Sequence, residues 1–465
     1  MIKKTAIYLI MAILALTCTS KVNDQVDLSL LKVSKNKHFI VDEKNNPFFW
    51  LGDTGWLLFK KLDREEAEIY LEDRTQKGFN VIQTMVIHNA KDAVNAYGDS
   101  AFVKGNFSAI KTTKGSDFDD TLQYDFWDHI DHIVDLAAEK ELYMALVPFW
   151  GSNVKDGHIE EETAVLFVRW LAERYKDKTN IIWLNGGDIK GSDSPLLWKL
   201  TGSELKSTDP DHLVTFHPRG RTQSSTWFHE EEWLDFNMFQ SGHRRYDQDN
   251  TELAYGEDNW RYVKDDYHLS PTKPTIDGEP SYEGIPQGLH DTLQPYWNDD
   301  DVRRYAYWSV FAGAFGYTYG HNAVMQFYQP GDQEFSFGPR EYWYDAINNP
   351  GASQMIHLKN LILSRPFLER IPDQSLIAGF KGERYDYMVA TRGNDYAFIY
   401  NYTGRNMCIV LGKIDGRRIK ASWYDPRQGR WQEIGELENT GAHEFNPPGE
   451  QKNGNDWVLV LDRIE

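Results

Sequence analysis

The stretch NIIWLNGGDIKG, residues Asn180–Gly191, decides how the rest of the chain is interpreted. Its apolar run Ile181–Leu184 has β-branched and aromatic side chains, which predicts a buried strand of a parallel sheet. Gly186 and Gly187 allow a tight turn, so Asp188 is expected on the loop just past the strand. Catalytic groups occupy that position in a (β/α) barrel, although an aspartate there can equally cap the next helix.

A second segment, PTIDGEPSYE at Pro274–Glu283, has the same form and favours the catalytic interpretation. It is a short apolar run that ends in Gly278 and a carboxylate, Glu279. The interval between Asp188 and Glu279 leaves room for three β/α units of roughly 30 residues each. That spacing is expected between strands four and seven of a barrel.

The remainder of the chain predicts a (β/α)8 TIM barrel followed by a small all-β domain. Strand-like and helix-like segments alternate about eight times between residues 28 and 370. The helix expected over Asp63–Lys77 begins with Asp63 and Glu66 placed as a capping box. From residue 371 to 465, short alternating runs separated by Gly, Asn and Asp predict a β-sandwich, to which we assign no chemistry.

Composition limits the possible partners. The 465-residue chain has a formal net charge of −20, which argues against nucleic acid and anionic membrane surfaces as partners. Its two cysteines exclude a disulfide framework. The 16 Trp and 25 Tyr suit clefts that stack on sugar rings, although most of them must fill the core.

Residues 1–20 resemble a bacterial lipoprotein signal. Lys3 and Lys4 precede an apolar core, Ile7–Leu16, which is too short to span a bilayer and ends close to Cys18. In such signals the cysteine is acylated after cleavage, whereas Thr17 leaves ordinary signal-peptide cleavage open. Either process predicts an exported protein, in the periplasm or on the outer membrane of a Gram-negative bacterium. Its membrane contact would be limited to the lipid anchor.

Polar and aromatic side chains follow nearly every predicted barrel strand. The candidate catalytic residues are Asp188 and Glu279, and the candidate substrate-binding residues are Asp53, His88, Trp150, Asn185, His217, Arg219, His243, Tyr319 and His321. No H-x-H, H-E-x-x-H or D-x-D pair stands at these strand ends, so we expect neither a catalytic metal nor another cofactor. Two facing carboxylates are instead what glycoside hydrolysis requires. One protonates the leaving oxygen, and the other attacks the anomeric carbon or activates water.

Several stretches resemble the apiosidase family, glycoside hydrolase family 140. They are FFWLGDTGWLLF (48–59), KGFNVIQTMV (77–86), NIIWLNGGD (180–188) and IDGEPSYEGI (276–285), with WYDPRQGRW (423–431) and DWVLVL (456–461) in the C-terminal domain. The resemblance implies that the aspartate of N-G-G-D, Asp188, and the glutamate of D-G-E-P, Glu279, are the catalytic pair. It also implies removal of apiose from rhamnogalacturonan II, a plant pectin. Related barrels carry Asn-Glu at the end of strand four, whereas here a shorter acid lies further along the loop.

We therefore expect an exported apiosidase-like glycoside hydrolase, with Asp188 as general acid/base and Glu279 as nucleophile. A carboxyl separation of about 5–6 Å is expected, as in retaining enzymes. One alternative is a glycosidase of the same fold acting on another plant side-chain sugar, such as a β-arabinofuranosidase. Others are a non-catalytic carbohydrate-binding surface lipoprotein and a collagen-binding or adhesive protein built on the C-terminal domain.

Pectin carries galacturonate and this chain is itself acidic, so long-range attraction cannot bring the two together. Any favourable contact must come from a local cluster of basic side chains. The cluster follows two neighbouring predicted strands and consists of Arg219, Arg221, His243, Arg244 and Arg245. We expect at least one of the four arginines to bind a galacturonate carboxylate beyond the cleaved bond through paired hydrogen bonds. The alternative is that they pair with nearby acids such as Asp247 and Asp249.

Overall fold

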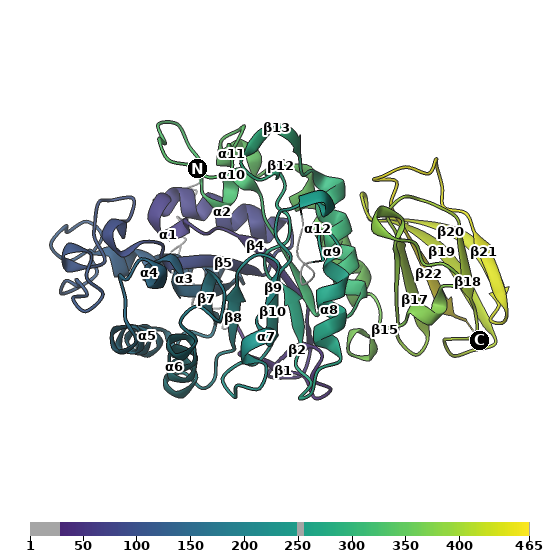
Figure 1. Ribbon diagram of the computed structural model, residues 1–465, viewed down its shortest axis with the longest axis horizontal. Coiled ribbons are helices and arrows are strands. Elements are labelled where there is room, and N and C mark those ends of the chain that lie inside the picture. The colour runs from purple at the N-terminus through teal and green to yellow at the C-terminus, as the bar shows by residue number, and fades with distance from the viewer. Residues whose placement is uncertain (1–27, 249–254, 465) are drawn as a thin grey trace, which may run out of the picture.

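The computed structural model describes residues 28–248 and 255–464, which form a barrel domain with a smaller β domain beside it (Figure 1). The predicted export signal, with Cys18, lies outside the described residues. Within the described ranges, no helix combines the length and the apolar character needed to cross a membrane.

Parallel strands that alternate with helices form the barrel wall. In chain order the strands are β4 (Trp50–Thr54), β5 (Val81–Ile87), β6 (Tyr143–Phe149), β7 (Ile181–Ile189), β8 (Val214–Pro218), β10 (Asn237–Gln240), β11 (Thr275–Asp277) and β14 (Gly316–Tyr319). The described residues give a nine-stranded sheet in the order β8-β7-β6-β5-β4-β14-β11-β10-β9, and β9 (Thr222–Gln223) pairs antiparallel with β10. Between β8 and β10, the backbone N–H of Asp235 donates to the Val214 carbonyl at 2.8 Å. The predicted TIM barrel is confirmed, with Asp188 on its fourth strand and Glu279 just after its seventh.

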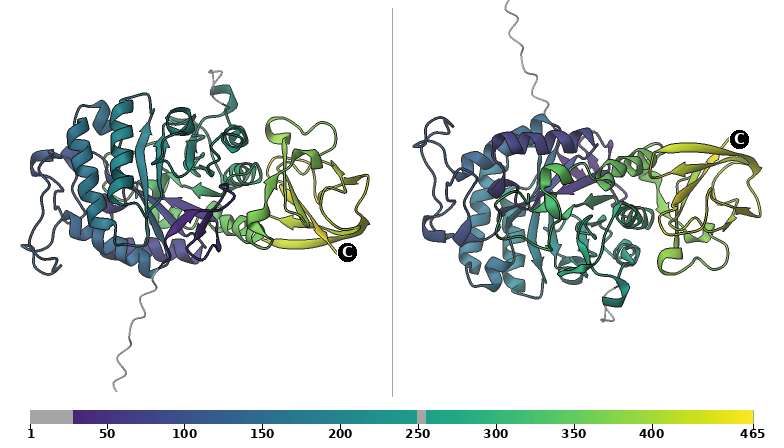
Figure 2. Two further views of the ribbon diagram at one scale, coloured as in Figure 1. Left: turned by 90° about the horizontal axis from the view of Figure 1, so that it is seen from below. Right: turned by 90° about the horizontal axis from the view of Figure 1, so that it is seen from above.

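Helices cover the outside of the barrel wall (Figure 2). The longer ones are α2 (Arg64–Gln76), α3 (Phe126–Glu139), α5 (Glu161–Tyr175), α6 (Pro195–Thr208), α8 (Asn259–Tyr267), α9 (Asp299–Phe311) and α12 (Pro350–Leu363). The short ones are α1 (Leu58–Lys61), α4 (Ser152–Lys155), α7 (Ser225–Phe228), α10 (Asn322–Met325) and α11 (Trp343–Ala346). The predicted capping box of α2 is confirmed, because the Glu66 backbone N–H donates to Asp63 at 2.8 Å and the Asp63 N–H donates to Glu66 at 3.2 Å.

Smaller elements surround this framework. An antiparallel sheet precedes the barrel and a hairpin follows β11; the strands are β1 (Leu31–Val33), β2 (Ile40–Asp42), β3 (Pro47–Phe48), β12 (Pro286–Gly288) and β13 (Asp291–Tyr296). The 3₁₀ turns are η1 (Ala90–Asp92), η2 (Val103–Gly105), η3 (Tyr246–Gln248), η4 (Phe367–Glu369), η5 (Gln374–Leu376) and η6 (Arg384–Asp386).

Strand β7 is longer than the sequence predicts. The strand expected over Ile181–Leu184 continues to Ile189, so the expectation that Asp188 lies on the following loop is wrong. Gly186 and Gly187 have φ values of 97° and 104°, and the pairing with β8 shifts register between Gly186 and Ile189. The two glycines therefore form a bulge within the strand instead of ending it, and bulges of this kind re-aim side chains next to active sites.

The C-terminal domain is all-β, as predicted. Its larger sheet has the order β15-β16-β17-β22-β19-β20, and β18 and β21 form a second sheet. The strands are β15 (Ile371–Pro372), β16 (Met388–Arg392), β17 (Tyr396–Asn401), β18 (Met407–Val410), β19 (Arg418–Asp425), β20 (Arg430–Glu438), β21 (Ala442–Phe445) and β22 (Trp457–Arg463).

Helix α9 lies beside the C-terminal domain and contacts it (Figure 1). The guanidinium of Arg303 donates two hydrogen bonds to Asp456 of the C-terminal domain, at 3.0 and 2.9 Å. One turn further along the helix, the Tyr307 ring stacks on Tyr400 with a centroid distance of 4.7 Å. All four side chains are buried, so the two domains share one continuous interior.

Candidate active site

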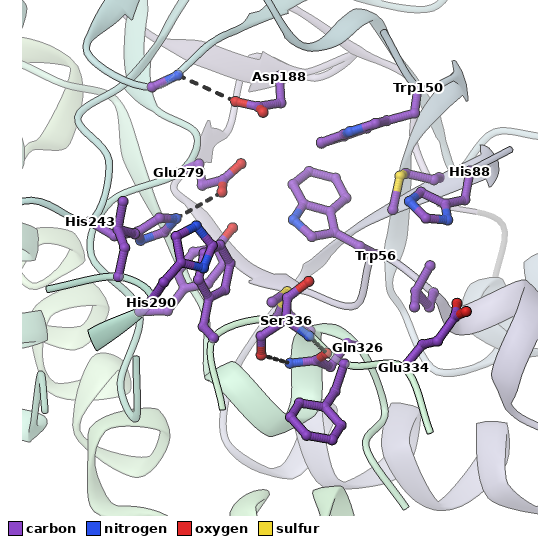
Figure 3. Close-up of a pocket in the computed structure, with 18 of the residues that line it drawn as sticks. Trp56, His88, Trp150, Asp188, His243, Glu279, His290, Gln326, Glu334 and Ser336 are labelled. Carbon is purple, nitrogen blue, oxygen red and sulfur yellow. Dashed lines mark hydrogen bonds and ion pairs between the residues drawn. The ribbon is translucent and has the colours of Figure 1, made fainter. Parts of the chain in front are cut away.

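A cavity of about 880 Å³ lies at the C-terminal end of the barrel strands (Figure 3). Its volume falls in the range of sites that bind small ligands. Among the residues proposed from the sequence, those that line it are His88, Trp150, Asp188, Arg219, His243 and Glu279. The two candidate catalytic carboxylates therefore share one cavity with two imidazoles, an indole and a guanidinium.

Asp188 is held at the bulge of β7 with its side chain directed into the cavity (Figure 3). It does not cap the next helix, because the N-cap of α6 is Ser194. The backbone N–H of Gly220 lies 3.4 Å from Asp188 Oδ1. Burial raises the pKa of the Asp188 carboxyl, and the nearby Glu279 carboxylate raises it further. Asp188 is therefore the carboxyl of the pair suited to hold and donate a proton.

Glu279 follows β11 and lies between two imidazoles. His243 Nε2 is 3.0 Å from Glu279 Oε1, and His217 Nε2 is 3.4 Å from Glu279 Oε2. The contact with His243 fixes the orientation of the carboxylate, whereas the His217 imidazole lies beside the second oxygen without a hydrogen bond. The Glu279 carboxylate is therefore held in one orientation at the cavity that it shares with Asp188.

His217 contacts both candidate catalytic residues, the backbone of Asp188 and the side chain of Glu279. The Asp188 backbone N–H lies 3.4 Å from His217 Nδ1, which identifies Nδ1 as the acceptor and Nε2 as the protonated nitrogen facing Glu279. Burial lowers the pKa of His217 to about 4, so its imidazole is neutral at pH 7. The side chain is fully buried and does not line the cavity, so its contact with a ligand would be indirect.

Four other residues proposed as substrate-binding do not reach the cavity, which corrects those predictions. Asp53 receives hydrogen bonds or ion pairs from Tyr70 at 2.6 Å and Arg74 at 2.7 Å on α2, and Asn185 donates to the Trp198 carbonyl on α6 at 2.8 Å. Tyr319 donates to Glu283 at 2.6 Å, and the Ala323 N–H donates to His321 Nδ1 at 3.1 Å. Successive side chains of a strand point to opposite faces, and those of Asp53, Asn185 and Tyr319 point into the surrounding framework, whereas His321 caps the N-terminus of α10.

Sequence reasoning missed much of the cavity wall. Trp56, four residues past the β4 glycine Gly52, packs against Trp150 with a centroid distance of 5.2 Å, and these rings lie across the cavity from His243 (Figure 3). Tyr282 and His290 also line the cavity. The stretch FFWLGDTGWLLF (48–59) is rich in aromatic residues, which could have drawn attention to Trp56. Nothing in that stretch indicates which of its rings faces the cavity.

A further wall comes from the segment after α10, for which we made no prediction. Gln326 donates to the Ser336 carbonyl at 3.0 Å, and the Ser336 N–H donates back to Gln326 at 2.7 Å. Asp332 in the same segment pairs with Lys61 of α1. These contacts hold the segment over one side of the cavity, where residues 331–337 line it.

The arginines of the basic cluster do not all reach the cavity. Arg219, Arg221 and Arg244 line the cavity, whereas Arg245 does not. Arg245 makes two contacts of 3.0 Å with Asp247, the pairing that we considered as an alternative, and donates to Gln294 at 3.0 Å. Asp249 lies outside the described residues.

Taken together, the cavity presents two carboxyl groups, of which that of Asp188 has a raised pKa, with aromatic rings around them. This arrangement can protonate a leaving oxygen on one side of a bound molecule and attack an electrophilic carbon on the other. Among the described residues, no group of three or more His, Cys, Asp or Glu side chains is arranged to hold a metal ion.

We predict that Glu279→Gln lowers the pKa of Asp188. The neutral amide removes the repulsion that raises the pKa of Asp188, so the pKa should move back toward 3.8. A ¹³C NMR titration of the aspartate carboxyl carbons measures this change, with the Asp188 signal assigned through Asp188→Asn. Glu334→Gln, on the rim of the same cavity, should leave it unchanged, and an equal shift in both variants would contradict the coupling.

Comparisons with known proteins identify the families that the two domains resemble. Residues 34–369 match a family model described as "Apiosidase-like, catalytic domain". Residues 371–462 match a second model, described as "Putative collagen-binding domain of a collagenase". A search among curated proteins gives no match.

Two solved structures are similar over nearly their whole length. One, described as "Glycoside hydrolase", has 48% sequence identity, covers 94% of this chain and 97% of its own, and superposes with a TM-score of 0.87. The other, a crystal structure described as a glycoside hydrolase family 5 from Bacteroides vulgatus ATCC 8482, has 47% identity, covers 93% of each chain and has a TM-score of 0.88.

Proposed function

Because the chain belongs to the apiosidase-like family of glycoside hydrolases, we propose that it removes apiose from the side chains of rhamnogalacturonan II. The observation that carries the proposal is the occurrence of Asp188 and Glu279 in one cavity, since glycoside hydrolysis needs two carboxylates in different protonation states. The family match supports apiose as the sugar, and the resemblance of the quoted sequence stretches supports the pectin.

The proposed reaction proceeds in two steps with retention of configuration. In the first, a Glu279 carboxylate oxygen attacks the anomeric carbon, the bond to the leaving oxygen breaks, and that oxygen takes the proton of Asp188. In the second, the Asp188 carboxylate removes a proton from water, whose oxygen attacks the anomeric carbon and releases Glu279. Trp56 and Trp150 would pack against the apolar face of the sugar.

Product analysis tests this function. The full-length protein is incubated with a pectin oligosaccharide that carries terminal apiose, and free sugars are separated by chromatography. We expect free apiose, and none from the same reaction with Glu279→Gln. Release of arabinose from an arabinofuranosyl substrate, without apiose, would favour the β-arabinofuranosidase alternative. Release of neither sugar by the wild-type protein would contradict a glycosidase for plant side chains.

Arg219 and Arg244 are proposed to recognise a galacturonate on the leaving-group side of the cleaved bond. Both side chains are exposed at the cavity, and the positive charge of Arg219 makes a small contribution that lowers the pKa of Asp188. Because the general acid lies next to the leaving oxygen, a cation beside it is close to the leaving sugar. Arg binds a carboxylate through two parallel hydrogen bonds.

We predict that Arg219→Ala or Arg244→Ala lowers kcat/KM on an acidic pectin fragment by roughly 10- to 100-fold, as expected for loss of a charge-assisted contact. A neutral apiosyl glycoside should be hydrolysed at nearly the wild-type rate. Arg245→Ala is the matched control, because that side chain is already paired with Asp247 and should change neither value appreciably. Equal losses on both substrates would contradict carboxylate recognition.

A further inference from the structure

The C-terminal domain contacts the barrel through the turn η6, at Arg384–Asp386. Tyr385 of this turn donates a hydrogen bond to Glu257 at 2.9 Å, and its ring lies 5.8 Å from that of Tyr246. Arg384 lies over the Tyr246 ring at 5.1 Å. Both barrel residues belong to the connection between β10 and α8, the same connection that carries His243. The C-terminal domain therefore contacts the segment that carries His243, the partner of Glu279.

Glu257 is the centre of these contacts. It is 1% exposed, and its Oε2 pairs with Arg304 of α9 at 2.8 Å, while Arg304 itself is fully buried. The Arg304 guanidinium lies 4.6 Å from the ring of Tyr385 and 5.2 Å from that of Tyr402, both in the C-terminal domain. A buried carboxylate keeps one orientation only when its oxygens are satisfied, and Tyr385 supplies the 2.9 Å contact to Oε1.

A backbone contact links Glu257 to the segment that carries His243. The Tyr246 backbone N–H lies 3.4 Å from Glu257 Oε1, so the same oxygen contacts Tyr385 and the main chain after β10. Three residues earlier in that main chain, His243 Nε2 approaches Glu279 Oε1 at 3.0 Å (Figure 3). The His243 carbonyl is fixed from the other side by Trp297 Nε1 at 3.2 Å. The backbone position of His243 is therefore set by contacts on both sides.

We propose that the C-terminal domain is a positioning element of the active site, acting through Tyr385 and Glu257 on His243. The proposal rests on Glu279 being the nucleophile of a glycosidase, but it does not depend on which sugar is removed. A change at Tyr385 should alter how well His243 aligns with Glu279 and hence the chemical step. Substrate binding should be little affected, because Tyr385 does not line the cavity.

Two matched tyrosine variants test the proposal. Tyr385→Phe removes the hydroxyl that contacts Glu257 but keeps the ring on Arg304. Tyr400→Phe removes the same group from another tyrosine between the domains, whose hydroxyl donates to the buried Asp456 at 3.1 Å instead of to Glu257. We expect Tyr385→Phe to lower kcat roughly 10-fold with KM unchanged, whereas Tyr400→Phe keeps both values. In the His243→Ala background, Tyr385→Phe should have no further effect on kcat.

A second measurement needs no substrate, so it separates this proposal from the proposed function. The histidine side-chain ¹H–¹⁵N NMR signal of His243, assigned through His243→Gln, should shift in Tyr385→Phe and not in Tyr400→Phe. If Tyr385→Phe does not fold, Glu257→Gln, which keeps an oxygen acceptor but removes the charge, should shift the same signal. An unchanged His243 signal in the folded variants, or equal loss of kcat in the two tyrosine variants, would overturn the proposal. Absence of apiose release by the wild-type protein would instead contradict the proposed function.

Discussion

Replacing Glu279 by glutamine should reduce hydrolysis by about 10⁴-fold or more, as removal of a catalytic nucleophile does in other hydrolases. The amide cannot form the ester intermediate with the anomeric carbon. It nevertheless has the shape of the carboxylate, and its oxygen can still accept the His243 N–H that lies 3.0 Å away in the wild-type protein. The loss should therefore appear in kcat while the thermal unfolding temperature stays close to that of the wild type.

Glu283→Gln provides the matched control for this experiment. Glu283 is another buried glutamate in the same sequence segment, but it accepts the hydroxyl of Tyr319 at 2.6 Å and does not line the cavity. Its replacement is expected to lower stability more than activity. Near-normal activity of Glu279→Gln, or an equal loss of activity in folded Glu283→Gln, would contradict the role assigned to Glu279.

The periodic parts of the fold could be predicted closely from the sequence. Apolar side chains that recur at helical spacing predict helices over Glu161–Tyr175 and Asn259–Tyr267, and the structure has both helices with those bounds. The same reasoning predicts the final barrel helix over Met355–Leu368, whereas the helix spans Pro350–Leu363. Its start is marked by a proline at the first helical turn, a signal that we overlooked. Strand β20 was missed because most of its residues are exposed and do not alternate between polar and apolar.

The candidate site was predictable only where a carboxylate follows a strand. That rule found Asp188 and Glu279, but it also selected Asp53, which is buried against Arg74. The sequence does not reveal which side chain at a strand end faces the cavity, because a bulge such as that at Gly186 changes the alternation. The wall at residues 331–337 depends on contacts between distant segments, such as the pair Lys61–Asp332, which have no local sequence signal.

Asp188→Asn should lower turnover of the natural substrate by about 10²–10⁴-fold, the usual contribution of a general acid. The effect should depend on the leaving group. An asparagine cannot donate the proton that a sugar leaving group needs, whereas an aryl leaving group of low pKa departs without one. On an aryl apioside the first step should therefore remain fast, and the second step, which lacks its base, should become limiting. Added azide should then raise the rate, because this small anion attacks the intermediate without general-base assistance.

The pH dependence of the same variant tests whether Asp188 is the group that must carry a proton for activity. Because burial raises the pKa of Asp188, the wild-type enzyme should lose activity as the pH rises through that value and the acid ionises. Asparagine does not titrate, so this alkaline decline should be absent from hydrolysis of the aryl apioside by Asp188→Asn. Asp193→Asn, five residues along and outside the cavity lining, should keep the wild-type profile. An alkaline decline that persists unchanged in Asp188→Asn, or equal losses on both substrates without azide rescue, would assign the acid to another residue.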